Sequence, residues 1–195
     1  MKPVFIRISI LLVLLTNSIV SAISQQSVRL LPTDSRIIIA GTSNLHDWEE
    51  TVEQFDVALV MKFEKNEILG IDHVHFNCKS GSISSDNSIM TNKTMDALRV
   101  DKYPEIVFTM VSIDKLTSAN AKFSGVLTGD LDLAGVTKRI SIVFSGYYEN
   151  NRIKISAVKD INLNDFKIKP PTAIMGALKT GENVVISFQL QFSLS

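Results

Sequence analysis

Three groups of side chains in this sequence could do chemistry, and the most suggestive is the trio His46-Asp47-Trp48. An imidazole beside a carboxylate could hold the polar end of a ligand, with the indole of Trp48 at the mouth of an apolar cavity. Alternatively, Asp47 caps a turn and Trp48 plugs one end of an apolar interior, since amphipathic rings often lie where such an interior meets water. Catalysis by His46 with a serine has little support, because the sequence lacks a nucleophile motif such as G-x-S-x-G.

The other two groups are a histidine pair and a set of basic residues. His73 and His75 are two residues apart, so on a strand they point to the same side and could begin a metal site. No further ligands are visible, and we expect exposed histidines, no metal and no cofactor. Lys93, Arg99 and Lys102 could pair with a phosphate or carboxylate head group, or could simply form a solvated helix face.

The clearest element that could position such groups is a β-hairpin. From Phe123 to Phe144, apolar and polar residues alternate on both sides of Ala134-Gly135-Val136-Thr137, which is the period of half-buried strands. Two strands alone are not stable in water, so the hairpin requires a larger sheet. Alternation elsewhere predicts strands at 27–31, 36–42, 55–63, 69–78, 106–110, 153–157 and 184–192, with turns at 65–67 and 150–151.

The segment 81–100 changes from the period of a strand to that of a helix. N-cap candidates at 85–88 precede Met90, Thr94, Met95 and Leu98, which recur at helical spacing, so we expect one helix of about three turns. The two methionines could line a cavity, because Met conforms to irregular apolar surfaces, or could belong to an ordinary core.

These elements predict a single all-β domain, an antiparallel barrel of about eight strands with one helix packed on it. Closing the sheet removes its two exposed edges and encloses its apolar faces. A membrane-spanning barrel would need an apolar outer band, whereas the outward positions here carry Asp, Lys, Ser, Gln and Asn, so no membrane span is expected.

The N-terminus has the layout of a secretory signal peptide. Lys2 and Arg7 precede an apolar run from Ile8 to Leu15, and a small-residue site ends at Ala22, so the expected domains are a signal peptide over 1–22 and a barrel over 23–195. Its removal leaves 18 basic and 20 acidic residues, a net charge of −2, which does not favour nucleic-acid binding. Cys78 is the only cysteine, so no internal disulfide is expected.

Three stretches together resemble the YceI-like family of exported lipid-binding proteins: SNLHDWEETV, MTNKTMDALRVDKYPEIVFTM and LTGDLDLAGVTKRISIVF. The later INLNDFKI is also similar. The resemblance implies a lipocalin-like barrel whose cavity holds a polyisoprenoid or another long amphiphile under the helix, in a periplasmic or secreted protein that is not an enzyme. Many members carry Arg-Asp-Xaa-His-Leu near the position of Lys93–Leu98, so a head-group contact through that Arg or His does not carry over to this chain.

The leading hypothesis is therefore an exported carrier of an isoprenoid or similar lipid; the sequence leaves its oligomeric state open, with a homodimer as one option. The candidate head-group residues are His46, Lys93, Arg99 and Lys102. The candidate cavity residues are Trp48, Phe55, Val57, Leu59, Phe76, Met95, Leu98, Phe108, Leu131, Leu133, Ile142, Phe144, Phe188 and Leu190. Two alternatives are a structural or interaction barrel that acts through its outer surface and a lipid-modifying enzyme that uses His46 at the cavity mouth.

Overall fold

A computed structural model describes residues 24–64, 67–173 and 178–194. The predicted signal peptide and the turn residues Lys65 and Asn66 lie outside the described residues, so the structure does not test them. None of the described helices is both long enough and apolar enough to cross a membrane.

Eight antiparallel strands form a closed barrel, as the alternating pattern predicts. Around the ring each strand pairs with the next, and β12 pairs with β1 to close it, with Val28 opposite Leu194. In ring order the strands are β1 (Ser24–Leu30), β4 (Phe55–Glu64), β5 (Glu67–Lys79), β7 (Glu105–Ala119), β8 (Lys122–Leu133), β9 (Val136–Glu149), β10 (Arg152–Asn162) and β12 (Leu178–Leu194).

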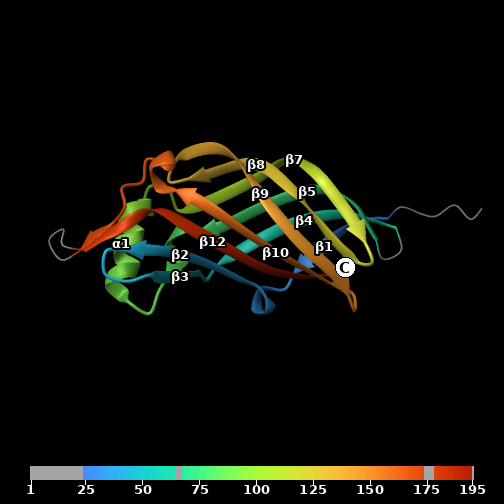
Figure 1. Cartoon of the computed structure of the whole chain (residues 1–195), viewed down its shortest axis with the longest axis horizontal. Coiled ribbons are helices and arrows are strands. Elements are labelled where there is room, and N and C mark those ends of the chain that lie inside the picture. The colour runs from blue at the N-terminus through green and yellow to red at the C-terminus, as the bar shows by residue number, and fades with distance from the viewer. Residues whose placement is uncertain (1–23, 65–66, 174–177, 195) are drawn as a thin grey trace, which may run out of the picture.

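At one end of the barrel the wall is extended by strands outside the ring. The first half of β12 pairs with β2 (Arg36–Ser43), which pairs with β3 (Trp48–Val52), and β3 pairs with β6 (Ile83–Ser84). The helix α1 (Ser88–Leu98) lies at this end, beside β2 and β3 (Figure 1). The remaining elements are β11 (Thr172–Ala173) on β12 and the short 3₁₀ helices η1 (Pro32–Asp34), η2 (Ser80–Ser82) and η3 (Leu163–Phe166).

Type I′ turns join the long strands of the hairpins. Asn150 and Asn151 have positive φ of 50° and 62°, and Ala134 and Gly135 have φ of 51° and 78°. This turn type requires positive φ at both central residues, and its twist matches that of the strands. The turn at Ala134-Gly135 is two residues long rather than the four predicted, and a Cβ on Gly135 would lie 2.2 Å from the ring of Tyr103, which packs there.

The alternation places apolar side chains inside the barrel as predicted. They form two buried clusters, one toward α1 around Phe108, Leu131 and Val184, and one toward the opposite end around Met61, Ile153 and Phe192. Strands β3 and β6 were not predicted, because β3 is short and contains two glutamates. Its pairing with β2, which sets Glu50 opposite Ile39, gives it strand geometry.

Candidate ligand-binding cavity

The barrel encloses an elongated cavity of about 330 Å³, within the range of small-molecule sites. Its walls are formed by side chains from β2, β3, β4, β5, β7, β8, β9, β10 and β12, with α1 across one end. Most of these side chains are aliphatic or aromatic, because most inward positions of the strands carry Ile, Leu, Val or Phe. Such a chamber favours an apolar ligand.

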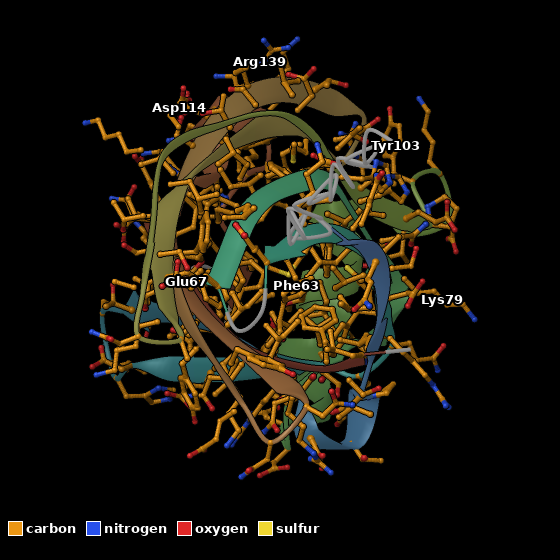
Figure 2. All side chains as sticks on the ribbon, turned by 90° about the vertical axis from the view of Figure 1, so that its right-hand side faces the viewer. Phe63, Glu67, Lys79, Tyr103, Asp114 and Arg139 are labelled. Atoms are coloured by element: carbon orange, nitrogen blue, oxygen red, sulfur yellow. The ribbon has the colours of Figure 1, made fainter. Side chains whose placement is uncertain are left out.

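The end of the barrel away from α1 is closed by packed side chains. Met61 and Ile153 are fully buried, and Phe63, Phe123 and Phe192 are at most 5% exposed. Seen from this end in Figure 2, Phe63 lies toward the middle, whereas Arg139, which is on β9 near the α1 end, points outward from the barrel. The Phe63 ring also packs against Tyr148, with ring centroids 6.1 Å apart. The cavity therefore ends on this cluster.

The opposite end is covered by α1. Met90, Lys93, Thr94, Ala97 and Leu98 line the cavity, and their spacing of three and four residues defines one face of the helix. The helix begins where the Asn87 side-chain oxygen accepts hydrogen bonds from the amides of Ile89 and Met90, at 3.0 and 3.3 Å. Exposed side chains, among them Lys93, belong to this lining, so the cavity reaches the surface here.

Most of the residues that the sequence proposed as cavity residues line this chamber. They are Trp48, Val57, Leu59, Phe76, Leu98, Phe108, Leu131, Leu133, Ile142, Phe144, Phe188 and Leu190.

Phe55 and Met95 are not among the described residues that line the cavity. The ring of Phe55, at the start of β4, packs against Phe76 with centroids 6.4 Å apart. Met95 follows Thr94 and so lies beside, rather than on, the face of α1 that meets the cavity; Met90 occupies that face instead. Helical spacing alone did not distinguish the two methionines.

The candidate head-group residues divide into two pairs. His46 and Lys93 line the cavity mouth. Arg99 does not line it: its guanidinium donates a 2.6 Å hydrogen bond to the Ala134 carbonyl and lies 4.6 Å from the centre of the Tyr103 ring. Lys102 also lies over Tyr103, at 5.3 Å. Arg99 and Lys102 therefore hold the C-terminal end of α1 near the β8–β9 turn.

The trio His46-Asp47-Trp48 combines features of both interpretations. The predicted cap at Asp47 is instead made by Ser43, whose hydroxyl accepts from the His46 amide and donates to the His46 carbonyl. His46 Nδ1 lies 2.9 Å from the Asp47 carbonyl oxygen, so its ring contacts the backbone rather than the carboxylate. Trp48 packs on Gly41, where a Cβ would be 2.2 Å from the indole, and lines the cavity while its Nε1 donates to the Thr42 carbonyl at 3.1 Å.

Glu50, which was not among the predicted site residues, is the most deeply buried charged side chain of the described residues, at 2% exposure. The Thr94 hydroxyl lies 2.9 Å from each of its carboxylate oxygens, and both residues line the cavity. Burial raises the pKa of Glu50 to about 7, although the Thr94 hydrogen bond acts in the opposite direction. The alternation of Trp48, Glu50 and Val52 was the signal that could have placed Glu50 inward.

Two other inward groups, Cys78 and Lys159, also line the cavity. Burial raises the pKa of the Cys78 thiol to about 12, so it stays protonated and behaves as a small apolar group. On the outer side of the same strand, His73 and His75 stack with ring centres 6.4 Å apart, and His75 Nδ1 lies 3.2 Å from the Thr109 hydroxyl. Within the part of the chain that the structure describes, no three His, Cys, Asp or Glu side chains cluster as a metal site would require.

Comparison with known proteins agrees with this architecture. The BcnA structure from Burkholderia cenocepacia is similar at a TM-score of 0.65 and 15% identity, covering 83% of this chain and 98% of that one. A YceI protein from Campylobacter jejuni gives 0.59 and 19%, covering 75% and 84%. A polyisoprenoid-binding domain from Saccharophagus degradans, implicated in plant cell wall breakdown, gives 0.58 and 12%, covering 89% and 100%.

At these identities the structural likeness shows the fold alone. The comparison with curated proteins finds no match. The model of one protein family, described as the YceI-like domain, matches residues 29–192, which include every strand of the ring from β4 to β10, nearly all of β12 and the end of β1. With a match over most of its length, this chain belongs to the YceI-like family.

Proposed function

We propose that this protein is an exported, non-catalytic carrier that holds a long-chain isoprenoid or a similar amphiphile in its barrel cavity. The observation that carries the proposal is an apolar chamber that is closed at one end by packed aromatic and aliphatic side chains and reaches the surface under α1. A similar barrel from Saccharophagus degradans is described as a polyisoprenoid-binding domain, which supports an isoprenoid as the ligand.

Burial of the ligand tail supplies the affinity. Each methylene group removed from water contributes about 0.8 kcal/mol. A tail of about ten carbons therefore gains several kcal/mol after the cost of ordering it. The polar end needs to remain near α1, where His46, Glu50, Lys93 and Thr94 bring polar atoms to the cavity lining. This arrangement requires no reaction, and in the described part of the chain no serine or cysteine side chain hydrogen-bonds to the His46 imidazole.

The first test is identification of the natural ligand. Protein purified from its native host under non-denaturing conditions is extracted with organic solvent and the extract is analysed by mass spectrometry. We expect a long-chain lipid in reproducible stoichiometric amounts. Its reproducible absence would favour a barrel that acts through its outer surface, where Val143 and Val158 face each other on β9 and β10 and are 68% and 58% exposed.

The second test places a larger side chain inside the cavity from β9. The control is the same substitution on the outer face of that strand. Ile142 lines the cavity, whereas the next residue, Val143, is exposed on the outer face of β9. In Ile142→Trp the larger side chain occupies ligand space, and we expect affinity for geranylgeraniol, measured by displacement of a fluorescent lipid, to fall at least tenfold. Val143→Trp should bind as the parent protein does. Equal affinities in the two folded variants would contradict a ligand inside the barrel.

A further inference from the structure

We propose that Glu50 and Thr94 form the head-group subsite of the cavity, and that this subsite selects an uncharged head group that donates a hydrogen bond, such as a hydroxyl, over a phosphate. The inference deepens the proposed function and rests on it, because it assumes that the ligand tail occupies the barrel.

The geometry of the pair leaves hydrogen-bonding capacity for a ligand. Glu50 on β3 and Thr94 on α1 meet inside the cavity lining, with the Thr94 hydroxyl 2.9 Å from both carboxylate oxygens. A hydroxyl has one hydrogen, which serves one of these oxygens at a time, whereas a carboxylate offers about four acceptor sites. The Glu50 carboxylate accepts no other hydrogen bond from a described residue, so its remaining sites are available to a group that enters the cavity.

The surrounding charges do not neutralise Glu50. The other titratable groups that line the cavity are His46, Cys78, Lys93 and Lys159. No lysine, arginine or histidine of the described residues lies within ion-pair distance of the Glu50 carboxylate.

Lys159 shares an inner-face row with Glu50 that runs through Ile186 and Ile39. Three strand spacings separate the two ends of this row, about 14 Å in a flat sheet. Lys93 lies on α1 and is exposed.

A buried carboxyl group with no cation nearby binds a neutral head group more favourably than a negatively charged one. Glu50 in its protonated form can donate to a hydroxyl oxygen, and in its ionised form it can accept from the hydroxyl hydrogen, so a hydroxyl satisfies both forms. Since burial raises the pKa of Glu50 to about 7, both forms are present near neutral pH. Beside Glu50, where no cation of the described residues is within ion-pair distance, a phosphate would add a second negative charge, and an unpaired buried charge is strongly unfavourable.

The experiment compares two ligands with the same tail, geranylgeraniol and geranylgeranyl phosphate, by competition with a fluorescent lipid at pH 7.5. The parent protein should bind the alcohol at least tenfold more tightly. In Glu50→Gln, whose amide retains hydrogen-bonding capacity without charge, we expect alcohol affinity to change less than threefold and phosphate affinity to rise at least fivefold. The matched control is Glu49→Gln, because Glu49 is the exposed neighbour on β3 and its variant should leave both affinities unchanged.

If Glu50→Gln does not fold, Glu50→Met provides an unbranched apolar replacement, and it should lose the same discrimination against phosphate while binding the alcohol about fivefold more weakly. Circular dichroism verifies folding of each variant. Equal affinity of the parent protein for both ligands, or a ratio that Glu50→Gln leaves unchanged, overturns the head-group inference while the proposed function stands. Failure of both ligands to bind the parent protein and Glu49→Gln overturns the proposed function as well.

Discussion

At the scale of single residues, the carboxyl of Glu50 makes the stability of the fold depend on pH. Burial raises its pKa from 4.5 to about 7, so the folded state binds the proton more tightly than the unfolded state does. The resulting stabilisation is fully present below pH 4.5 and is lost as the pH rises toward and through 7. A shift of this size corresponds to roughly 1 to 3 kcal/mol after allowance for solvent screening.

The variant Glu50→Gln tests this dependence, because its amide cannot ionise. We expect the free energy of unfolding of Glu50→Gln, relative to the parent protein, to increase by roughly 1 to 3 kcal/mol between pH 5 and pH 8. Urea denaturation at a series of pH values measures it, and Glu49→Gln serves as the exposed control. Every other residue is the same in the parent protein and Glu50→Gln, so the difference between the two reports the Glu50 carboxyl. Parallel stability curves for parent and Glu50→Gln would contradict the prediction.

Among the residues of the barrel wall, it was easier to predict which apolar side chains point into the barrel than which polar ones do. Leu131 and Leu133 lie inside, as predicted, because they alternate with Asp130 and Asp132 along a long strand. Glu50 shares a period of two with Trp48 and Val52, but the segment is only five residues long and its charge is typical of an exposed position. Its burial depends on Thr94, which is 44 positions away in the sequence, and no local pattern reports that contact.

At the scale of elements, the helix α1 is held over the cavity by its cap and by its C-terminal contacts. The Asn87 side chain accepts hydrogen bonds from two amides that have no partner within the helix. At the other end, Arg99 adopts a left-handed conformation with φ of 53°, and its guanidinium bonds to Ala134 in the β8–β9 turn. These contacts fix the inward face that carries Met90 and Thr94.

The cap is tested by Asn87→Ala. Loss of an N-cap side chain typically costs about 1 kcal/mol, and we expect that decrease in the free energy of unfolding, measured by urea denaturation. Hydrogen exchange of the amides of Ile89 and Met90 should quicken, since their acceptor is removed. Asn92→Ala provides the control because Asn92 is exposed within the same helix, so its variant should change stability by less than about 0.5 kcal/mol. Equal stabilities of the two variants would show that the cap does not hold α1.

Among the elements, the long strands and the helix could be predicted from the sequence, and the short strands could not. The helix begins at Ser88 after an N-cap within the predicted 85–88 segment, and the turn at Asn150-Asn151 lies where it was predicted. Strand β6 has only two residues, and it forms because Ile83 pairs with Val52 on β3. Such long-range pairing adds the strands that support Glu50, so local alternation could indicate the direction of Glu50 but not the contacts around it.

At the scale of the whole molecule, the barrel combines a filled half and a hollow half. The ring of eight strands and the inward faces follow from alternation, but the depth of the cavity does not, because it depends on how side chains from opposite walls meet. Phe123 and Phe144 illustrate this dependence. They are neighbours on β8 and β9 with ring centroids 6.3 Å apart, both are at most 5% exposed, and only Phe144 lines the cavity.

Phe144 should therefore help to set the length of the tail that fits, whereas Phe123 should not. In Phe144→Leu the shorter side chain deepens the chamber, so we expect the tightest-binding member of the series geraniol, farnesol, geranylgeraniol and longer isoprenols to shift toward a longer chain. Phe123→Leu loses a similar buried ring from the closed end and should keep the parent preference, although both variants should be less stable by about 1 to 3 kcal/mol. Competition with a fluorescent lipid measures each affinity, and thermal denaturation measures stability. If both variants kept the chain-length preference of the parent protein, Phe144 would not limit the length of the tail. The cavity would then extend past Phe144 when a ligand fills it.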